Sequence, residues 1–95
     1  MDKTTTHENL CKEIHELYVK KNHDYGDSFG KTYKNLGIIS AATRISDKYN
    51  RFIELAKGNE PLVSTETIRD TLIDMANYAL MTIIELENNN DICRR

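Results

Sequence analysis

Apolar side chains recur every third or fourth position along most of this chain, and no stretch alternates strictly between apolar and polar residues. A spacing near 3.6 residues is typical of amphipathic helices, whereas a strand with one buried face repeats every two residues. We therefore predict an all-α fold with three long helices and one short helix. The 95 residues are expected to form a single α-helical domain, 1–95, with frayed ends at about 1–4 and 89–95.

A capping-box pattern predicts where the first helix begins. Thr5 is followed three residues later by Glu8, so each side chain can bind a backbone N–H group of the other residue. Apolar residues then follow at helical spacing, and this helix is expected to run to about Lys21.

Glycines mark the ends of the next two predicted helices. The short helix is expected to have Asp27 or Ser28 as its cap and to end at Gly37. The second long helix is expected over 38–57, with Gly58 as its C-cap. Its apolar stripe, which should face the core, comprises Ile38, Ala42, Ile45, Tyr49, Phe52 and Ala56.

The third long helix, expected from Ser64 or Thr65 to about Asn88, is apolar over more than half of its circumference. A surface helix needs a narrower apolar stripe than this. We therefore predict that a second copy of the chain covers part of it, in a homo-oligomer that is a dimer or a dimer of dimers. The remaining polar strip comprises Asp70, Asp74, Asn77 and Tyr78.

The segment 21–29, between the first two predicted helices, is dense in groups that bind ligands. Gly26 interrupts the helical pattern and the apolar residues there show no period, so a loop is expected. Aromatic rings can stack on a base, while amides and cations can meet phosphate or sugar. The alternative is a connector whose Asp and Ser side chains cap the next helix. The candidate ligand-binding residues are Lys21, Asn22, His23, Asp24, Tyr25, Asp27, Ser28 and Phe29.

Basic side chains form a row on the second long helix, at positions i, i+4 and i+7. This row lies at the edge of the apolar stripe, where neighbouring helices meet. Arg44 or Arg51 can form an interhelical salt bridge to Asp70 or Asp74, or the row can line a cleft that grips phosphate, for which arginine has a suitable bidentate geometry. The candidate ligand-binding residues therefore also include Arg44, Lys48, Arg51, Asn77 and Tyr78.

Asp70 and Asp74 lie one helical turn apart, so their charges repel each other unless something compensates them. The basic row is one source of compensation, and a divalent metal is the other. The candidate metal ligands are Asp47, Asp70 and Asp74, and Glu13 or Glu16 on the first helix could add further oxygen atoms. No catalytic residue can be assigned from these patterns.

Composition excludes several classes of partner. The net charge of −2 argues against the strongly basic face that binding of duplex nucleic acid requires. Cys11 and Cys93 give neither a disulfide framework nor zinc-ligand spacing, which favours reduced thiols in the cytoplasm. No apolar run approaches the roughly 20 residues of a membrane span. We therefore expect neither duplex nucleic acid nor membrane as a partner.

Three ordered motifs, 21–29, 44–51 and 70–79, give the chain a family resemblance. Over about residues 8–86 it resembles the nucleotide modification associated domain 1 family of phages and bacteria. The resemblance implies an α-helical domain associated with nucleotide metabolism. More distantly, the chain is similar to the MazG-like all-α nucleotide pyrophosphohydrolases, whose helical bundle holds magnesium through acidic pairs on two neighbouring helices.

This resemblance leads to two functional hypotheses. Asp70 and Asp74 can correspond to one of the two acidic pairs of these enzymes. The other acidic pair is missing, because the helix that would carry it has Asp47 within the basic row. Basic residues in place of carboxylates keep the affinity for phosphate but remove the metal ligands that hydrolysis needs. This favours nucleotide binding over nucleotide hydrolysis. The first hypothesis is therefore a phage-type nucleotide-binding protein that captures a phosphorylated nucleotide, cyclic and modified forms included, and sequesters a host immune signal in the host cytoplasm. It requires no cofactor.

The second hypothesis is a magnesium-dependent nucleotide pyrophosphohydrolase that acts in nucleotide metabolism or modification. It would use Asp47, Asp70 and Asp74 together with Glu13 or Glu16. A third hypothesis involves no ligand: the chain is a structural helical module that only forms oligomers.

Overall fold

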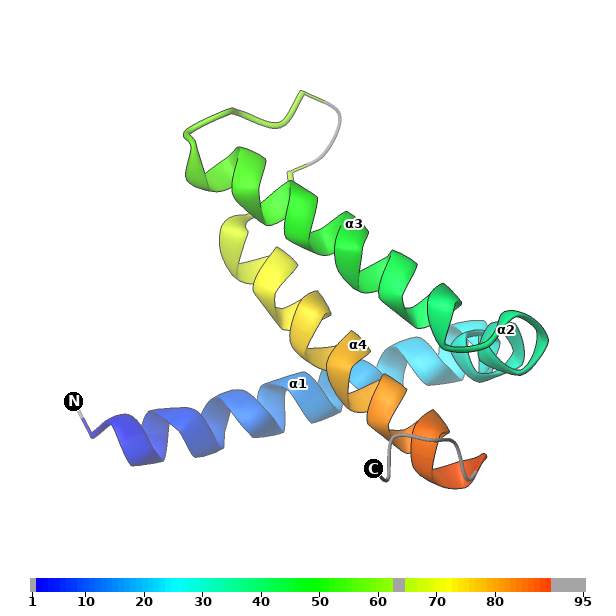
Figure 1. Ribbon diagram of the computed structural model, residues 1–95. Coiled ribbons are helices and arrows are strands. Elements are labelled where there is room, and N and C mark those ends of the chain that lie inside the picture. The colour runs from blue at the N-terminus through cyan, green and yellow to red at the C-terminus, as the bar shows by residue number, and fades with distance from the viewer. Residues whose placement is uncertain (1, 63–64, 90–95) are drawn as a thin grey trace.

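The computed structural model describes residues 2–62 and 65–89, which form four helices and contain no strand (Figure 1). This confirms the predicted all-α fold with three long helices and one short helix. The helices are α1 (Lys3–Tyr25), α2 (Ser28–Leu36), α3 (Ile38–Ala56) and α4 (Ile68–Asn88).

The antiparallel hairpin of α3 and α4 is the centre of the fold, and these two helices make the most extensive contact in the molecule. Ala41 on α3 and Thr71 on α4 are completely buried, and such small side chains let helices approach closely. The C-terminal half of α1 crosses α4, and α2 packs on α3 and α4. The N-terminal half of α1 extends away from the other helices (Figure 1).

The first helix begins earlier and ends later than the sequence predicted. Asp2, rather than Thr5, is its N-cap: the Asp2 carboxylate accepts hydrogen bonds from the backbone N–H of Thr4 at 3.0 Å and from the Thr5 hydroxyl at 2.8 Å. Asp is a better N-cap than Thr. Lys3 and Thr4, in the segment 1–4 that is predicted to fray, thus belong to the first turn of α1. The helix continues past Lys21 to Tyr25, because no helix breaker occurs before Gly26.

The connection between α1 and α2 is only two residues long. Gly26 has φ 58° and ψ −173°, a backbone conformation that is essentially restricted to glycine. The loop predicted over 21–29 is thus wrong for Lys21–Tyr25, which form the end of α1. The prediction for α2 is confirmed: the Asp27 side chain accepts a hydrogen bond from the backbone N–H of Gly30 at 3.2 Å, and the helix ends before Gly37.

The predicted core stripe of α3 is wrong in part. Ile38 and Tyr49 are 44% and 51% exposed, whereas Ala41, about 60° or more round the helix from these two residues, is completely buried. The reason is that α3 has two apolar faces and packs within this chain through only one of them. The helix ends at Ala56 with Lys57 as its C-cap, and Gly58 follows with φ 92°.

The last helix begins a few residues after the predicted start. Thr65 lies outside it, and Ser64 lies outside the described residues. Thr67 is the N-cap, in a capping box with Asp70, and Asn89 is the C-cap. Of the end at about 89–95 that is predicted to fray, Asn89 is the C-cap of α4, and 90–95 lie outside the described residues.

Within 2–62 and 65–89, no helix is long and apolar enough to cross a bilayer.

Candidate functional site

A cavity of about 360 Å³ lies where the end of α1, the start of α2, and α3 and α4 meet. Gly26, whose backbone conformation ends α1 and leads into α2, is one of the residues that line this cavity. We call this cavity the interhelical pocket. Its lining residues are Tyr18, Lys21, Asn22, Tyr25, Gly26, Asp27, Ser28, Phe29, Arg44, Asp74, Asn77, Tyr78 and Met81.

The structure brings nine of the thirteen candidate ligand-binding residues to the pocket. These are Lys21, Asn22, Tyr25, Asp27, Ser28, Phe29, Arg44, Asn77 and Tyr78. It does not bring His23, Asp24, Lys48 or Arg51 to the pocket wall. Asp74, which the sequence suggested as a metal ligand, also lines the pocket. The sequence did not identify Tyr18 and Met81 as pocket residues. They lie four residues, about one helical turn, from Asn22 and Asn77, and this spacing could have identified them.

The helical conformation of 21–25 explains why two candidates lie elsewhere. His23 and Asp24 are on the outer side of α1, where their side chains are 88% and 69% exposed and lie 3.3 Å apart. A loop could have turned all of these side chains inwards, whereas a helix places successive residues about 100° apart.

Aromatic rings form one wall of the pocket. Phe29 and Tyr78 are stacked, with their ring centroids 5.9 Å apart and their planes 24° from parallel. Tyr25 also lines the pocket and is 70% exposed. An exposed ring of this kind provides a face on which a planar ligand can stack.

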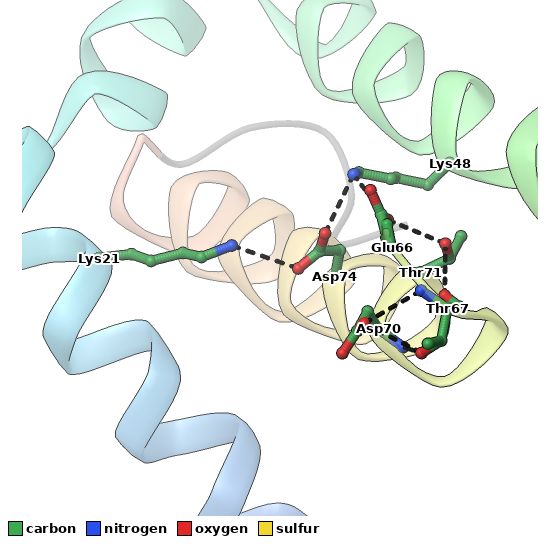
Figure 2. A network of polar contacts seen from close by, with 7 residues as sticks. All are labelled: Lys21, Lys48, Glu66, Thr67, Asp70, Thr71 and Asp74. Atoms are coloured by element: carbon green, nitrogen blue, oxygen red, sulfur yellow. Dashed lines mark hydrogen bonds and ion pairs between the residues drawn. The ribbon is translucent and has the colours of Figure 1, made fainter. Parts of the chain in front are cut away.

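Asp74 connects three helices at the edge of the pocket (Figure 2). Its Oδ1 accepts a hydrogen bond from Lys21 Nζ of α1 at 3.3 Å, and its Oδ2 lies 3.0 Å from Lys48 Nζ of α3. The Asp74 side chain is 18% exposed and that of Lys48 23% exposed. Asp74 thus holds the ammonium group of Lys21 at the pocket wall.

The three members of the basic row of α3, Arg44, Lys48 and Arg51, have different surroundings. Lys48 also donates to Glu66 Oε1 at 3.3 Å, and the Thr71 hydroxyl donates to the same oxygen at 2.9 Å. Partial burial opposes the charge of Lys48, but its hydrogen bonds to Asp74 and Glu66 outweigh burial, so the pKa of Lys48 is raised above its ordinary value. The interhelical salt bridge foreseen for an arginine is therefore formed by Lys48.

The two arginines of the row have no such partner. Among the described residues, no carboxylate forms an ion pair with Arg44, which lines the pocket. Arg51 lies outside the pocket, and its Nε and Nη2 atoms are buried without a hydrogen-bond partner. Arg44 is therefore the guanidinium group that is available to a ligand in the pocket.

Asp70 has a structural role at the start of α4. Its carboxylate accepts hydrogen bonds from the backbone N–H and the hydroxyl of Thr67, at 3.0 and 2.9 Å. These bonds favour the charged form and hold the pKa of Asp70 below its ordinary value. Figure 2 shows Asp70 bonded to Thr67, while Asp74, one turn further along, is bonded to lysines.

The candidate metal ligands do not form a metal site. Across 2–62 and 65–89, no group of three or more His, Cys, Asp or Glu side chains is arranged to hold a metal ion. Asp47 is exposed on α3, Asp70 is used in the capping box, and Asp74 is paired with two lysines. The residues as arranged therefore do not fit magnesium, which needs several oxygen ligands in a near-octahedral arrangement.

A second groove, of about 580 Å³, adjoins the interhelical pocket between α1 and α4. Its acidic lining residues are Glu13, Glu16, Glu66, Asp70 and Asp74. Both carboxylate oxygens of Glu13 accept hydrogen bonds from the Arg69 guanidinium at 2.7 Å. This bidentate contact holds the pKa of Glu13 below its usual range. Of these five acidic residues, Glu13, Glu66, Asp70 and Asp74 are therefore already bound to side chains of the protein or to a helix cap.

A family model described as nucleotide modification associated domain 1 matches residues 21–86. The chain belongs to this family. The matched stretch contains the three motifs of the sequence and every residue of the interhelical pocket except Tyr18. Comparison with curated proteins and with solved structures gave no match.

Proposed function

We propose that this member of the nucleotide modification associated domain 1 family is a nucleotide-binding protein, and that the interhelical pocket is its binding site. The observation that carries the proposal is one cavity in which an exposed aromatic ring, Tyr25, and the guanidinium group of Arg44, which forms no ion pair with a described residue, are both available. A nucleotide needs both kinds of group, because its base stacks on rings and its phosphate takes bidentate hydrogen bonds from arginine.

The dimensions and charge of the pocket support this proposal. Its volume of about 360 Å³ lies within the range of about 300–1,000 Å³ that small-molecule sites occupy. Lys21 adds a second cation, and the negative charge of Asp74 is compensated from behind by Lys48. The amide of Asn77 is less available, because its Nδ2 donates to the backbone oxygen of Ile14 at 3.1 Å. Asn22 is the other amide at the pocket wall.

We also propose that nucleotide binding by this chain serves to capture a nucleotide. A small protein that binds a nucleotide and does not turn it over removes that nucleotide from solution. In a phage-encoded chain, the captured molecule would be a host immune signal, such as a cyclic or modified nucleotide, and capture would take place in the host cytoplasm as a homo-oligomer. The family name supports nucleotide chemistry, and the phage setting and the immune signal are part of the proposal.

Two measurements test the proposed binding. Mass spectrometry of small molecules released from the purified protein is expected to yield an intact phosphorylated nucleotide. Titration calorimetry with a panel of nucleoside mono-, di- and triphosphates and cyclic dinucleotides would then identify the class that binds most tightly. The proposal is wrong if no member of the panel binds at millimolar concentration and no nucleotide is released.

The acidic groove next to the pocket favours a second candidate, a nucleotide pyrophosphohydrolase of the MazG-like type. The groove shares Lys21 and Asp74 with the pocket, so a phosphate chain bound to Lys21 would lie beside carboxylates. Magnesium does not fit these carboxylates as they are arranged, and we derive no catalytic step from it. Release of pyrophosphate from a nucleoside triphosphate at enzymatic rates would favour this candidate over capture alone.

A further inference from the structure

The hairpin of α3 and α4 has an apolar face that none of the described residues covers. On α3 it contains Ile38 and Tyr49, which are 44% and 51% exposed. On α4 it contains Leu72 and Ile83, which are 43% and 51% exposed. The residues of each helix lie within about 40° of one another around its axis. We call these residues, with the exposed Ala42 and Ala79 between them, the outer face of the hairpin.

Both halves of the outer face point to the same side. On α3 these residues lie about 60–100° beyond Ala41, which faces α4, and on α4 they lie about 80–120° beyond Thr71, which faces α3, in the same rotational sense. Because α3 and α4 are antiparallel, rotations in the same sense about the two axes bring both halves to one side of the hairpin. The pocket lies on the other side, since Asp74 is about 160° or more from Leu72 and Ile83 around α4.

The single chain exposes more surface than a compact protein of its size. A folded protein of 11.0 kDa exposes about 5,600 Å², whereas this chain exposes 7264 Å². Its radius of gyration is 14.8 Å, against about 12.4 Å for a compact domain of this length. The excess of about 1,600 Å² is larger than the roughly 800 Å² that each partner contributes to a standard interface.

The buried core of the single chain is correspondingly small. Among the described residues, the buried hydrophobic side chains are Tyr33, Ala41 and Ile73. The other apolar side chains of the described helices are half-buried or exposed, so the single chain keeps less apolar surface from water than a compact domain of this length. Further burial would stabilise the fold, and the outer face is an apolar surface that can supply it.

We propose that the outer face is a homodimer interface, at which the α3–α4 hairpins of two copies form a four-helix bundle about a two-fold axis. The sequence of α4 fits its own copy: small Ala76 and Ala79 lie in the middle of the face, and Leu72 and Ile83 lie at equal distances on either side. If two α4 helices cross antiparallel between Ala76 and Ala79, Leu72 of one copy packs beside the partner's Ile83. This self-complementarity is what an isologous interface requires.

This arrangement leaves the two interhelical pockets on opposite outer sides of the dimer. The proposal is therefore independent of nucleotide binding, and a failure of one would not decide the other. It also explains why the predicted core stripe of α3 is half exposed in a single chain: Ile38 and Tyr49 would be core residues of the dimer.

Sedimentation equilibrium of the full chain and of two matched variants tests the interface. The unmodified protein is expected to be a dimer at about 10 μM, and Ile83→Glu should raise the dissociation constant at least 100-fold, because a carboxylate would be buried unpaired. Val19→Glu is the control, since Val19 on α1 is also 51% exposed and lies outside the outer face. A monomeric unmodified protein, a dimeric Ile83→Glu, or equal dissociation by Val19→Glu would overturn the proposal.

A second measurement covers the case in which Ile83→Glu does not fold. If folding and dimerisation are coupled, the melting temperature of the unmodified protein should rise with protein concentration. A melting temperature that does not change over a 100-fold range of concentration would contradict the dimer.

Discussion

Oδ2 of Asp74 lies 3.0 Å from Nζ of Lys48, and this ion pair joins α4 to α3 at a point where both side chains are largely buried. The same carboxylate also pairs with Lys21 of α1. One residue thus connects three helices and positions a cation at the pocket. In the basic row of α3, which the sequence suggested for phosphate binding, Lys48 thus has a structural role, whereas Arg44 lines the pocket and forms no ion pair with a described residue.

Replacing Asp74 with alanine should destabilise the fold by about 1.5–3 kcal/mol, the usual range for hydrogen bonds to charged groups. Lys48 would keep only Glu66 as a carboxylate partner, and Lys21 would have none among the described residues. Urea denaturation would measure the change. Asp47→Ala on exposed α3 surface is the control, and an equal loss in both variants would show that the Asp74 pairs do not stabilise the protein.

Arg44→Ala should weaken nucleotide binding about 10- to 100-fold, since a charged hydrogen bond contributes about 1.5–3 kcal/mol. Helicity should hardly change, because Arg44 forms no ion pair within the described residues. Calorimetry and circular dichroism would measure the two effects. Lys34→Ala, an exposed cation outside the pocket, should keep full affinity. Unchanged affinity for Arg44→Ala would exclude this residue from the binding site.

Gly26→Ala should cost about 1–3 kcal/mol of stability, because alanine is strained in the backbone conformation of Gly26. It should also weaken nucleotide binding, since Gly26 sets the angle between α1 and α2 at the pocket. Gly58→Ala is a matched control: Gly58 also has a positive φ, of 92°, but lies far along the chain from the pocket residues of α1 and α2. Gly58→Ala should lower the melting temperature and leave affinity unchanged. Equal affinity losses would show that Gly26 acts only through global stability.

Acid should destabilise the start of α4 through Asp70. Its pKa in the folded protein is lowered by the hydrogen bonds from Thr67, so its charged form stabilises the fold. This contribution is fully present above the unfolded pKa of about 3.9 and is lost as the pH falls through the lower folded value. Thermal unfolding between pH 7 and pH 2.5 would measure it. Asp70→Asn should lose less stability than the unmodified protein over the acidic part of this range, and identical pH profiles would contradict the role of the cap.

A single strong cue in the sequence was sufficient at the end of α2: Gly37 has no competitor there, and the structure confirms it. At the start of α2 the sequence left Asp27 and Ser28 as alternatives, and Asp27 is the cap. At the start of α1 the sequence predicted Thr5, whereas the better cap Asp2 lies three residues earlier and begins the helix. The same holds near Thr67, where several hydroxyl side chains precede the helix. Local patterns identify a helix more reliably than they identify its first residue.

The pocket was predictable in its composition and less so in its geometry. The segment 21–29 and Arg44 were recognised because rings, amides and cations gather there. The positions of His23 and Asp24 depended on whether Lys21–Tyr25 is helical, which residue spacing did not settle. Which basic residue of α3 meets Asp74 depends on where α3 and α4 cross, and that is a property of tertiary packing.

The role of Asp74 also separates nucleotide capture from metal-dependent hydrolysis. In the structure its two oxygens are occupied by lysines, so nucleotide affinity should be insensitive to a metal chelator. Asp74→Asn should weaken binding, because Lys21 would lose the charge that holds it at the pocket wall. If Asp74 instead binds magnesium during turnover, chelation should abolish pyrophosphate release, and Asp74→Asn should act mainly on the rate. Calorimetry and a pyrophosphate assay, each with and without EDTA, would measure both. Chelator-sensitive pyrophosphate release at enzymatic rates would replace capture by hydrolysis as the function of this chain.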